Sequence, residues 1–190
     1  MASLSFKKEK MKDKNRTPVA ISSDAYFFEK DKSESILVLG IGNYLMGDEG
    51  VGVQLIQKMD TLDLPPYIDI LDGGTGGFLL LSCIEAYGHI IFVDATMDGK
   101  KEGSISIIKP KYASDFPSAL SVHDVGLKDM VEAVYLMDKR PEIQLMTISI
   151  KEMKPMTMEL SDLVAASIQE AADLILKMAK EIHTKKHNLV

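Results

Sequence analysis

The spacing of hydrophobic positions divides most of the chain into alternating strands and helices. Short continuous or alternating apolar runs are typical of strands, whereas apolar residues repeated every three or four positions are typical of helices. The predicted strands lie near residues 36–39, 67–71, 89–93, 104–108 and 142–150. The predicted helices lie near residues 50–60, 78–87, 122–138 and 160–182. This order predicts an α/β fold in which helices cover both faces of a mainly parallel sheet.

In such a sheet, the functional site lies beyond the carboxyl ends of the strands. Four segments are therefore candidates for this functional site. Three of them follow predicted strands and carry acidic residues, and the fourth leads into a helix and holds His123; they are residues 40–49, 72–77, 94–99 and 118–126.

The first 34 residues have no sustained apolar periodicity. Residues 1–16 carry six basic and two acidic side chains, a net charge of +4. Such composition predicts a basic, disordered extension. Residues 35–183 then form the predicted domain, and residues 184–190 form a polar tail.

Composition and charge exclude several classes of protein. The whole chain has a net charge of −6, which leaves −10 for residues 17–190 once the +4 of the first segment is subtracted. An acidic body argues against nucleic acid as the main partner. The single cysteine, Cys83, excludes a disulfide framework and is expected in the core. No apolar run approaches the ~20 residues that span a bilayer, so we expect a cytoplasmic protein without membrane insertion.

The glycine-rich loop at residues 40–50 reads G-I-G-N-Y-L-M-G-D-E-G. A dinucleotide fingerprint would need glycine where Leu45 stands. Asp48 and Glu49 would also repel a diphosphate at the start of the following helix. We expect one of these two carboxylates to cap that helix and the other to face outward as a ligand.

Three side chains could together hold a metal ion. Glu49, Asp94 and His123 would form a mixed oxygen and nitrogen site for a divalent first-row metal, with coordination positions left open. A purely structural interpretation also stands: Asp94 and Asp72 can bond nearby backbone amides, and His123 can be a half-exposed residue near a helix start. Spacing alone leaves both interpretations open.

Four motifs in the same order resemble the [NiFe]-hydrogenase maturation endopeptidases. They are G-I-G-N-Y-L-M-G-D-E-G-V-G-V, L-D-G-G-T-G-G, F-V-D-A and S-V-H-D-V-G-L, and the resemblance covers about residues 35–180. It implies a three-layer α/β/α sandwich around a twisted, mostly parallel five-stranded sheet. The antiparallel member should be the strand at residues 104–108 or its neighbour, because a short connection reaches it.

The resemblance also implies an activity and its residues. The family removes a C-terminal peptide from the nickel-loaded precursor of the hydrogenase large subunit. Its metal-contacting positions fall on Glu49, Asp94 and His123, and the nickel is expected to come from the precursor rather than to be permanently bound. Asp72 falls on a position near the site and is the expected catalytic residue. The sequence leaves the oligomeric state open.

Three other functions remain as alternatives. A metal chaperone or docking protein for hydrogenase assembly would use the same three ligands without cleaving anything. A nucleotide-binding or small-molecule-binding domain is disfavoured by Asp48 and Glu49. An endopeptidase of the same fold with another substrate is the third alternative, since the spore-germination proteases share a similar fold.

Several of the 12 methionines lie between residues 146 and 158. They could line a docking surface or fill the core, and we favour the core.

Overall fold

The computed structural model describes residues 32–110, 127–136 and 140–187. Five strands form one sheet in the order β2-β1-β3-β5-β4. Their bounds are β1 Lys32–Ile41, β2 Ile68–Gly74, β3 Tyr87–Thr96, β4 Ile105–Ile108 and β5 Glu142–Ser149. All neighbouring strands are parallel except β4, which runs antiparallel to β5. The predicted fold class is therefore confirmed, including its antiparallel strand.

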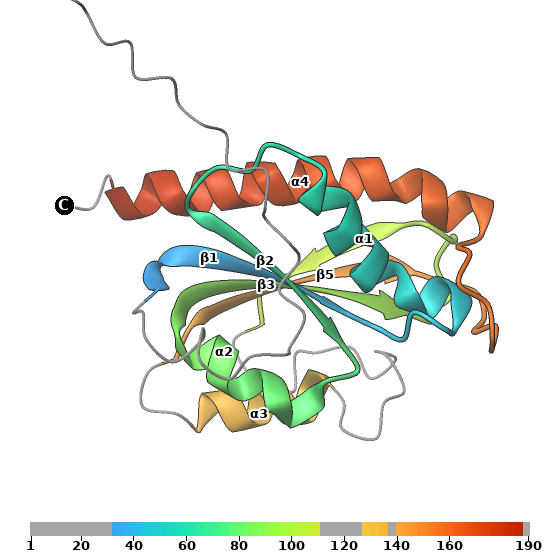
Figure 1. The fold of residues 1–190 in the computed structure, drawn as a ribbon, viewed down its shortest axis with the longest axis horizontal. Helices are drawn as coiled ribbons and strands as arrows, with labels where there is room; N and C mark the ends of the chain where they lie inside the picture. The colour runs from blue at the N-terminus through green and yellow to red at the C-terminus, as the bar shows by residue number, and fades with distance from the viewer. Residues whose placement is uncertain (1–31, 111–126, 137–139, 188–190) are drawn as a thin grey trace, which may run out of the picture.

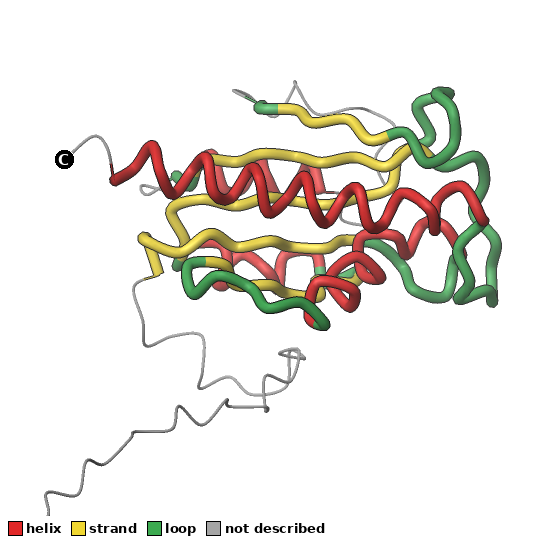
Figure 2. Tube along the Cα trace, turned by 90° about the horizontal axis from the view of Figure 1, so that it is seen from above, coloured by secondary structure: helices red, strands yellow, loops and turns green. Residues whose placement is uncertain are grey.

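Helices cover both faces of this sheet (Figure 1). They are α1 Val51–Asp60, α2 Leu81–Glu85, α3 Leu127–Tyr135 and α4 Asp162–His187, with the 3-10 helices η1 Gly47–Gly50 and η2 Gly77–Leu80. α1 and α4 lie on one face, and α2 and α3 lie on the other. Figure 2 shows α4 extended along the whole length of the strands.

Each face of the sheet has its own hydrophobic core. Val38, Val93 and Ile175 belong to the cluster beneath α1 and α4. Phe92 and Cys83 belong to the cluster beneath α2 and α3, so the predicted core position of the cysteine is confirmed. Because α4 is amphipathic, its apolar stripe faces the sheet and its other faces stay polar. None of the described helices is both long and apolar enough to cross a membrane.

The first strand begins earlier than the hydrophobic pattern indicates. β1 starts at Lys32, whereas the predicted domain starts at residue 35. The amine of Lys32 donates to Asp69 Oδ2 at 3.1 Å and to the Tyr87 hydroxyl at 3.0 Å, which joins β1 to both neighbouring strands. Lys186 Nζ of α4 donates to Ser33 O at 2.7 Å. Polar contacts therefore hold the start of β1, where the sequence has no apolar pattern.

Two helix boundaries also differ from the prediction. The helix expected over residues 78–87 is divided into η2 and a five-residue α2, and Tyr87 already belongs to β3. The last helix continues to His187, into the range assigned to a polar tail. The predicted extension before residue 32 lies outside the described residues.

Two glycines let α1 approach the sheet closely. A Cβ atom on Gly52 would lie 2.3 Å from Ile41 O and 2.5 Å from Val93 O. A Cβ atom on Gly40 would lie 2.3 Å from Gly52 O. Since real Cβ atoms do not come this close to backbone oxygens, only glycine fits at either position. The start of α1 is thereby fixed against the carboxyl ends of β1 and β3.

We predict that Gly52→Ala lowers the free energy of unfolding by about 3 kcal/mol through overpacking. Helix propensity alone would favour alanine by about 1 kcal/mol, so a loss has to come from the crowded contact. Chemical denaturation followed by circular dichroism measures the change.

Gly99→Ala is the control for this substitution. Gly99 has a φ of +75°, but a Cβ atom there would meet nothing within 4 Å apart from its chain neighbours. The variant therefore tests backbone strain without crowding, at a cost of about 1 kcal/mol. Equal losses for the two variants would contradict the close-approach explanation.

Candidate functional site

The acidic residues selected from the sequence lie near the carboxyl ends of β1, β2 and β3. Figure 1 shows the end of β3 at its right. Gly40, near the end of β1, pairs with Asp72 of β2 on one side and with Val93 of β3 on the other. Asp94 follows Val93 directly. The loop after β1 leads into η1, which holds Glu49 and contacts β3. His123 lies outside the described residues, so its place at this edge stays a prediction.

Glu49 is 2% exposed, and a tight backbone turn surrounds it. Its Oε2 accepts a hydrogen bond of 2.7 Å from the backbone N–H of Asn43. Gly42 has a φ of +138°, and a Cβ atom there would lie 2.1 Å from Glu49 O. Asn43 also closes the turn through its Oδ1, which accepts from Leu45 N at 3.0 Å.

Asp48 and Glu49 lie in the first turn of η1, whose N-cap is Met46. No side-chain hydrogen bond caps η1 or α1. The carboxylate of Asp48 instead accepts from the backbone N–H of Ser161 at 2.6 Å, just before α4. For Asp48 the capping prediction was therefore wrong, because a partner 113 positions away in the sequence takes this carboxylate.

Asp94 is fully buried and lies within β3, where it pairs with Thr147 of β5, because the strand continues to Thr96 instead of ending before residue 94 as expected. Its Oδ1 accepts from the backbone N–H of Ala95 at 2.8 Å. Strand side chains alternate between faces, so Asp94 shares the face of Ile90 and Phe92, which α2 and α3 cover. α3, which covers this same face, begins four residues after His123 in the sequence.

Asp72 ends the regular part of β2 and is half-buried. Its Oδ1 accepts from Gly74 N at 3.0 Å. Burial raises the pKa of the Asp72 carboxyl above its usual range, although this hydrogen bond opposes the shift. A carboxyl of this kind can hold and release a proton at a higher pH than a free aspartate.

The described part of the chain supplies two carboxylates of the expected metal site. Among the residues that the structure describes, no three His, Cys, Asp or Glu side chains gather closely enough to hold a metal ion. The third expected ligand, His123, lies outside them. Glu49 and Asp94 are oxygen donors of the type that nickel and other divalent metals accept, and an imidazole would complete the set.

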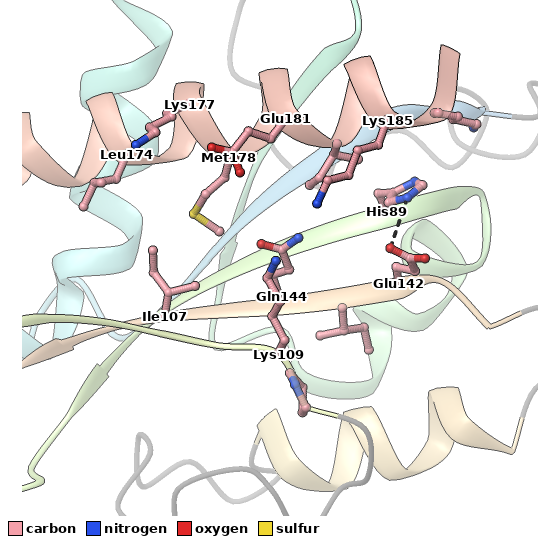
Figure 3. A pocket seen from close by; sticks show the side chains of 14 residues that line it. His89, Ile107, Lys109, Glu142, Gln144, Leu174, Lys177, Met178, Glu181 and Lys185 are labelled. Carbon is pink, nitrogen blue, oxygen red and sulfur yellow. Dashed lines mark ion pairs between the residues drawn. The ribbon is translucent and has the colours of Figure 1, made fainter. Parts of the chain in front are cut away.

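A groove lies at the opposite end of the sheet from these acidic residues, between α4 and the strands β4 and β5 (Figure 3). Its volume is about 820 Å³. Within it, His89 Nε2 lies 3.4 Å from Glu142 Oε2. Burial lowers the pKa of His89, although Glu142 opposes the shift. Glu142 begins β5 and His89 lies two residues after the start of β3, so the groove belongs to the amino-terminal ends of these strands.

The methionines between residues 146 and 158 divide into two groups. Met146 is fully buried and Met153 packs against the core, as expected. Met156 and Met158 are exposed, so the core interpretation was wrong for these two. They lie in the loop that joins β5 to α4. The flanking lysines and glutamates were the available signal that this segment is a surface loop.

Comparisons with known proteins agree on one family. Residues 53–178 match the model of the hydrogenase maturation protease family. The chain is 32% identical over 149 residues to the hydrogenase 2 maturation protease of Escherichia coli, covering 77% of this chain and 91% of that protein.

Solved structures give the same result. The hydrogenase-maturating endopeptidase HybD from E. coli matches with a TM-score of 0.69 and 31% identity, over 77% of this chain and 93% of that one. The [NiFe] hydrogenase maturation protease HybD from Thermococcus kodakarensis matches with a TM-score of 0.64 and 28% identity, over 76% and 99%.

The raised pKa of Asp72 predicts how this residue affects stability. The unfolded chain loses the proton first as pH rises above about 4, so the free energy of unfolding falls through that range. Asp72→Asn cannot ionise and keeps an oxygen that can accept from Gly74 N. We expect the variant to be more stable than the wild type at pH 7 and equally stable at pH 3, by urea denaturation.

Asp98→Asn is the control with the opposite sign. Although burial raises its pKa, hydrogen bonds from Lys100 and Ser149 lower the pKa of Asp98 overall. Its substitution should therefore reduce stability at pH 7. If Asp72→Asn also reduces stability at pH 7, burial is not the dominant influence on the pKa of Asp72.

Proposed function

The chain belongs to the hydrogenase maturation protease family, and from this premise we propose that it removes a C-terminal peptide from the nickel-loaded precursor of a [NiFe]-hydrogenase large subunit. Membership of this family makes the chain a peptide hydrolase. We propose the substrate, the recognition of its nickel and the roles of individual residues.

One observation carries the proposal: Glu49 and Asp94 are held at the same edge of the sheet and are almost completely buried. Ionised carboxylates removed from water are costly unless hydrogen-bond donors or cations compensate them. Backbone N–H groups of Asn43 and Ala95 each supply one donor. A substrate nickel ion would add positive charge at the same place.

We assign the recognition of substrate nickel to Glu49, Asp94 and His123. Three protein donors leave coordination positions for the ligands that the precursor already provides. A site of this kind recognises a nickel-loaded precursor without removing its metal. An empty precursor offers these three residues nothing to bind, so cleavage would depend on nickel insertion.

We assign proton transfer to Asp72. Hydrolysis requires a proton to leave the attacking water and another to reach the departing amine. The raised pKa of Asp72 suits a carboxylate that accepts the proton of the attacking water and then donates a proton to the departing amine. The pairing of Asp72 with Gly40, near the end of β1, supports a role for this carboxyl at the same end of the sheet as Glu49 and Asp94.

A processing assay tests the proposed function. The purified protein is mixed with nickel-loaded or nickel-free large-subunit precursor, and mass spectrometry reads the C-terminus of each product. We expect a C-terminal peptide to be lost only from the loaded precursor. Binding without cleavage of either form would instead support a docking protein, and equal cleavage of both forms would exclude nickel recognition.

We predict that Glu49→Gln, Asp94→Asn and His123→Ala each abolish processing, because each removes one donor to the substrate nickel. Glu142→Gln is the matched control, since its carboxylate lies at the opposite end of the sheet. It should process at the wild-type rate. Circular dichroism should show all four variants folded, and normal processing by any of the first three would contradict its assignment.

A further inference from the structure

Three exposed apolar side chains lie beside the candidate site. Leu45 is 51% exposed, Met156 is 88% exposed and Met158 is 54% exposed. We call these three residues the apolar rim. Exposed apolar groups that gather beside a functional site commonly mark a contact surface, and methionine adapts to varied partner shapes.

Two loops build the rim by pairing with each other. Met46 forms a parallel bridge with Thr157. Gly47 N donates to Thr157 O at 2.7 Å, and Thr157 N donates to Leu45 O at 3.2 Å. Leu45 and Met156 lie in turns beside this isolated bridge, and the hydrogen bonds of Thr157 hold the residues that flank the bridge close together. Leu45, Met156 and Met158 are those flanking residues, and all three are exposed to solvent.

The rim is fixed to the start of α1 and α4. Lys154 N donates to Met46 O at 3.2 Å, and Gln54 Nε2 of α1 donates to Met158 O at 2.8 Å. Asp48 accepts from Ser161 N three residues beyond Met158. The rim is therefore a preformed surface, which lowers the conformational entropy lost on binding.

Met156 adopts a backbone conformation that its side chain does not favour. Its φ is +60°, and it is the only described residue other than glycine with a positive φ. Such a conformation costs about 1–3 kcal/mol for a residue with a Cβ and persists mainly where function requires it. Here the conformation coincides with a methionine side chain exposed to solvent.

The rim is continuous with the residues around Glu49. Asn43 N binds the Glu49 carboxylate, and Asn43 Oδ1 accepts from the backbone N–H of Leu45. Glu49 and Asp94 expose almost no surface of their own. A protein that brings nickel to them must therefore make its wider contacts with neighbouring residues, and the rim supplies an apolar surface on the same loop.

We propose that the apolar rim docks an apolar segment of the large-subunit precursor next to its nickel site. The proposal rests on the proposed function. Beside the rim, Lys154 Nζ lies 3.2 Å from Glu152 Oε1, so the charge of this lysine has a partner within the chain. The exposed apolar rim therefore favours an apolar partner segment.

Single and combined variants of the rim test this docking role. Leu45→Ser, Met156→Asn and Met158→Ser together should raise the KM for nickel-loaded precursor about tenfold and leave kcat unchanged. Met156→Asn is the most informative single variant, because asparagine tolerates a positive φ better than methionine. It should keep or raise thermal stability while weakening docking.

Leu136→Ser is the matched control. Leu136 is also 88% exposed, and it follows α3 at the opposite end of the sheet, where Tyr135 bonds Pro110 O after β4. We expect its KM and kcat to equal those of the wild type. A similar rise in KM for Leu136→Ser would show a general effect of surface hydrophobicity and overturn the docking role of the rim.

Direct precursor binding, measured by biolayer interferometry, separates this inference from the proposed function. Unchanged binding and KM for the triple variant, with normal wild-type cleavage, would overturn the docking role and leave the function intact. Binding that the triple variant weakens about tenfold, without cleavage by the wild type, would support docking and reject the peptidase function. A dimer that the triple variant abolishes would assign the rim to a second copy of the chain and overturn the proposal.

Discussion

The close approach of α1 to the carboxyl ends of β1 and β3 determines the rest of the site. Gly40 and Gly52 each let a backbone oxygen of the facing element come close to the glycine, where a Cβ atom would prevent the approach. This contact places η1 at the sheet edge, and η1 in turn brings Glu49 toward the end of β3, where Asp94 lies. The buried carboxylates thus depend on a packing constraint that involves neither of their side chains.

The same constraint links the site to the surface around it. Once η1 is fixed, Asp48 reaches Ser161 and the preceding loop pairs with Thr157. The loop before α4 is thereby attached to the loop that surrounds Glu49. Recognition of the nickel ion and docking of the protein that carries it would then use two parts of one continuous structure.

The hydrophobic pattern was sufficient to predict the strands and the helices on both faces of the sheet, because core burial determines both. The antiparallel strand was expected from the family resemblance and from the short connection that precedes β4. The hydrophobic pattern placed the start of β1 too late, since polar contacts of Lys32 with Asp69 and Tyr87 hold that end. It also missed the bond between Asp48 and Ser161, because local sequence gives no sign of so distant a partner. Glu49, Asp94 and Asp72 were selected because strand ends are visible in the sequence, and the place of His123 stays a prediction.

Nickel X-ray absorption spectroscopy would test most directly whether these buried carboxylates recognise the substrate metal. The nickel-loaded precursor is measured alone and in complex with the Asp72→Asn variant, which we expect to leave the complex uncleaved. We expect additional oxygen or nitrogen donors at nickel in the complex, and their loss when Glu49→Gln is added. An unchanged nickel coordination shell in a demonstrated complex would contradict direct recognition by Glu49 and Asp94.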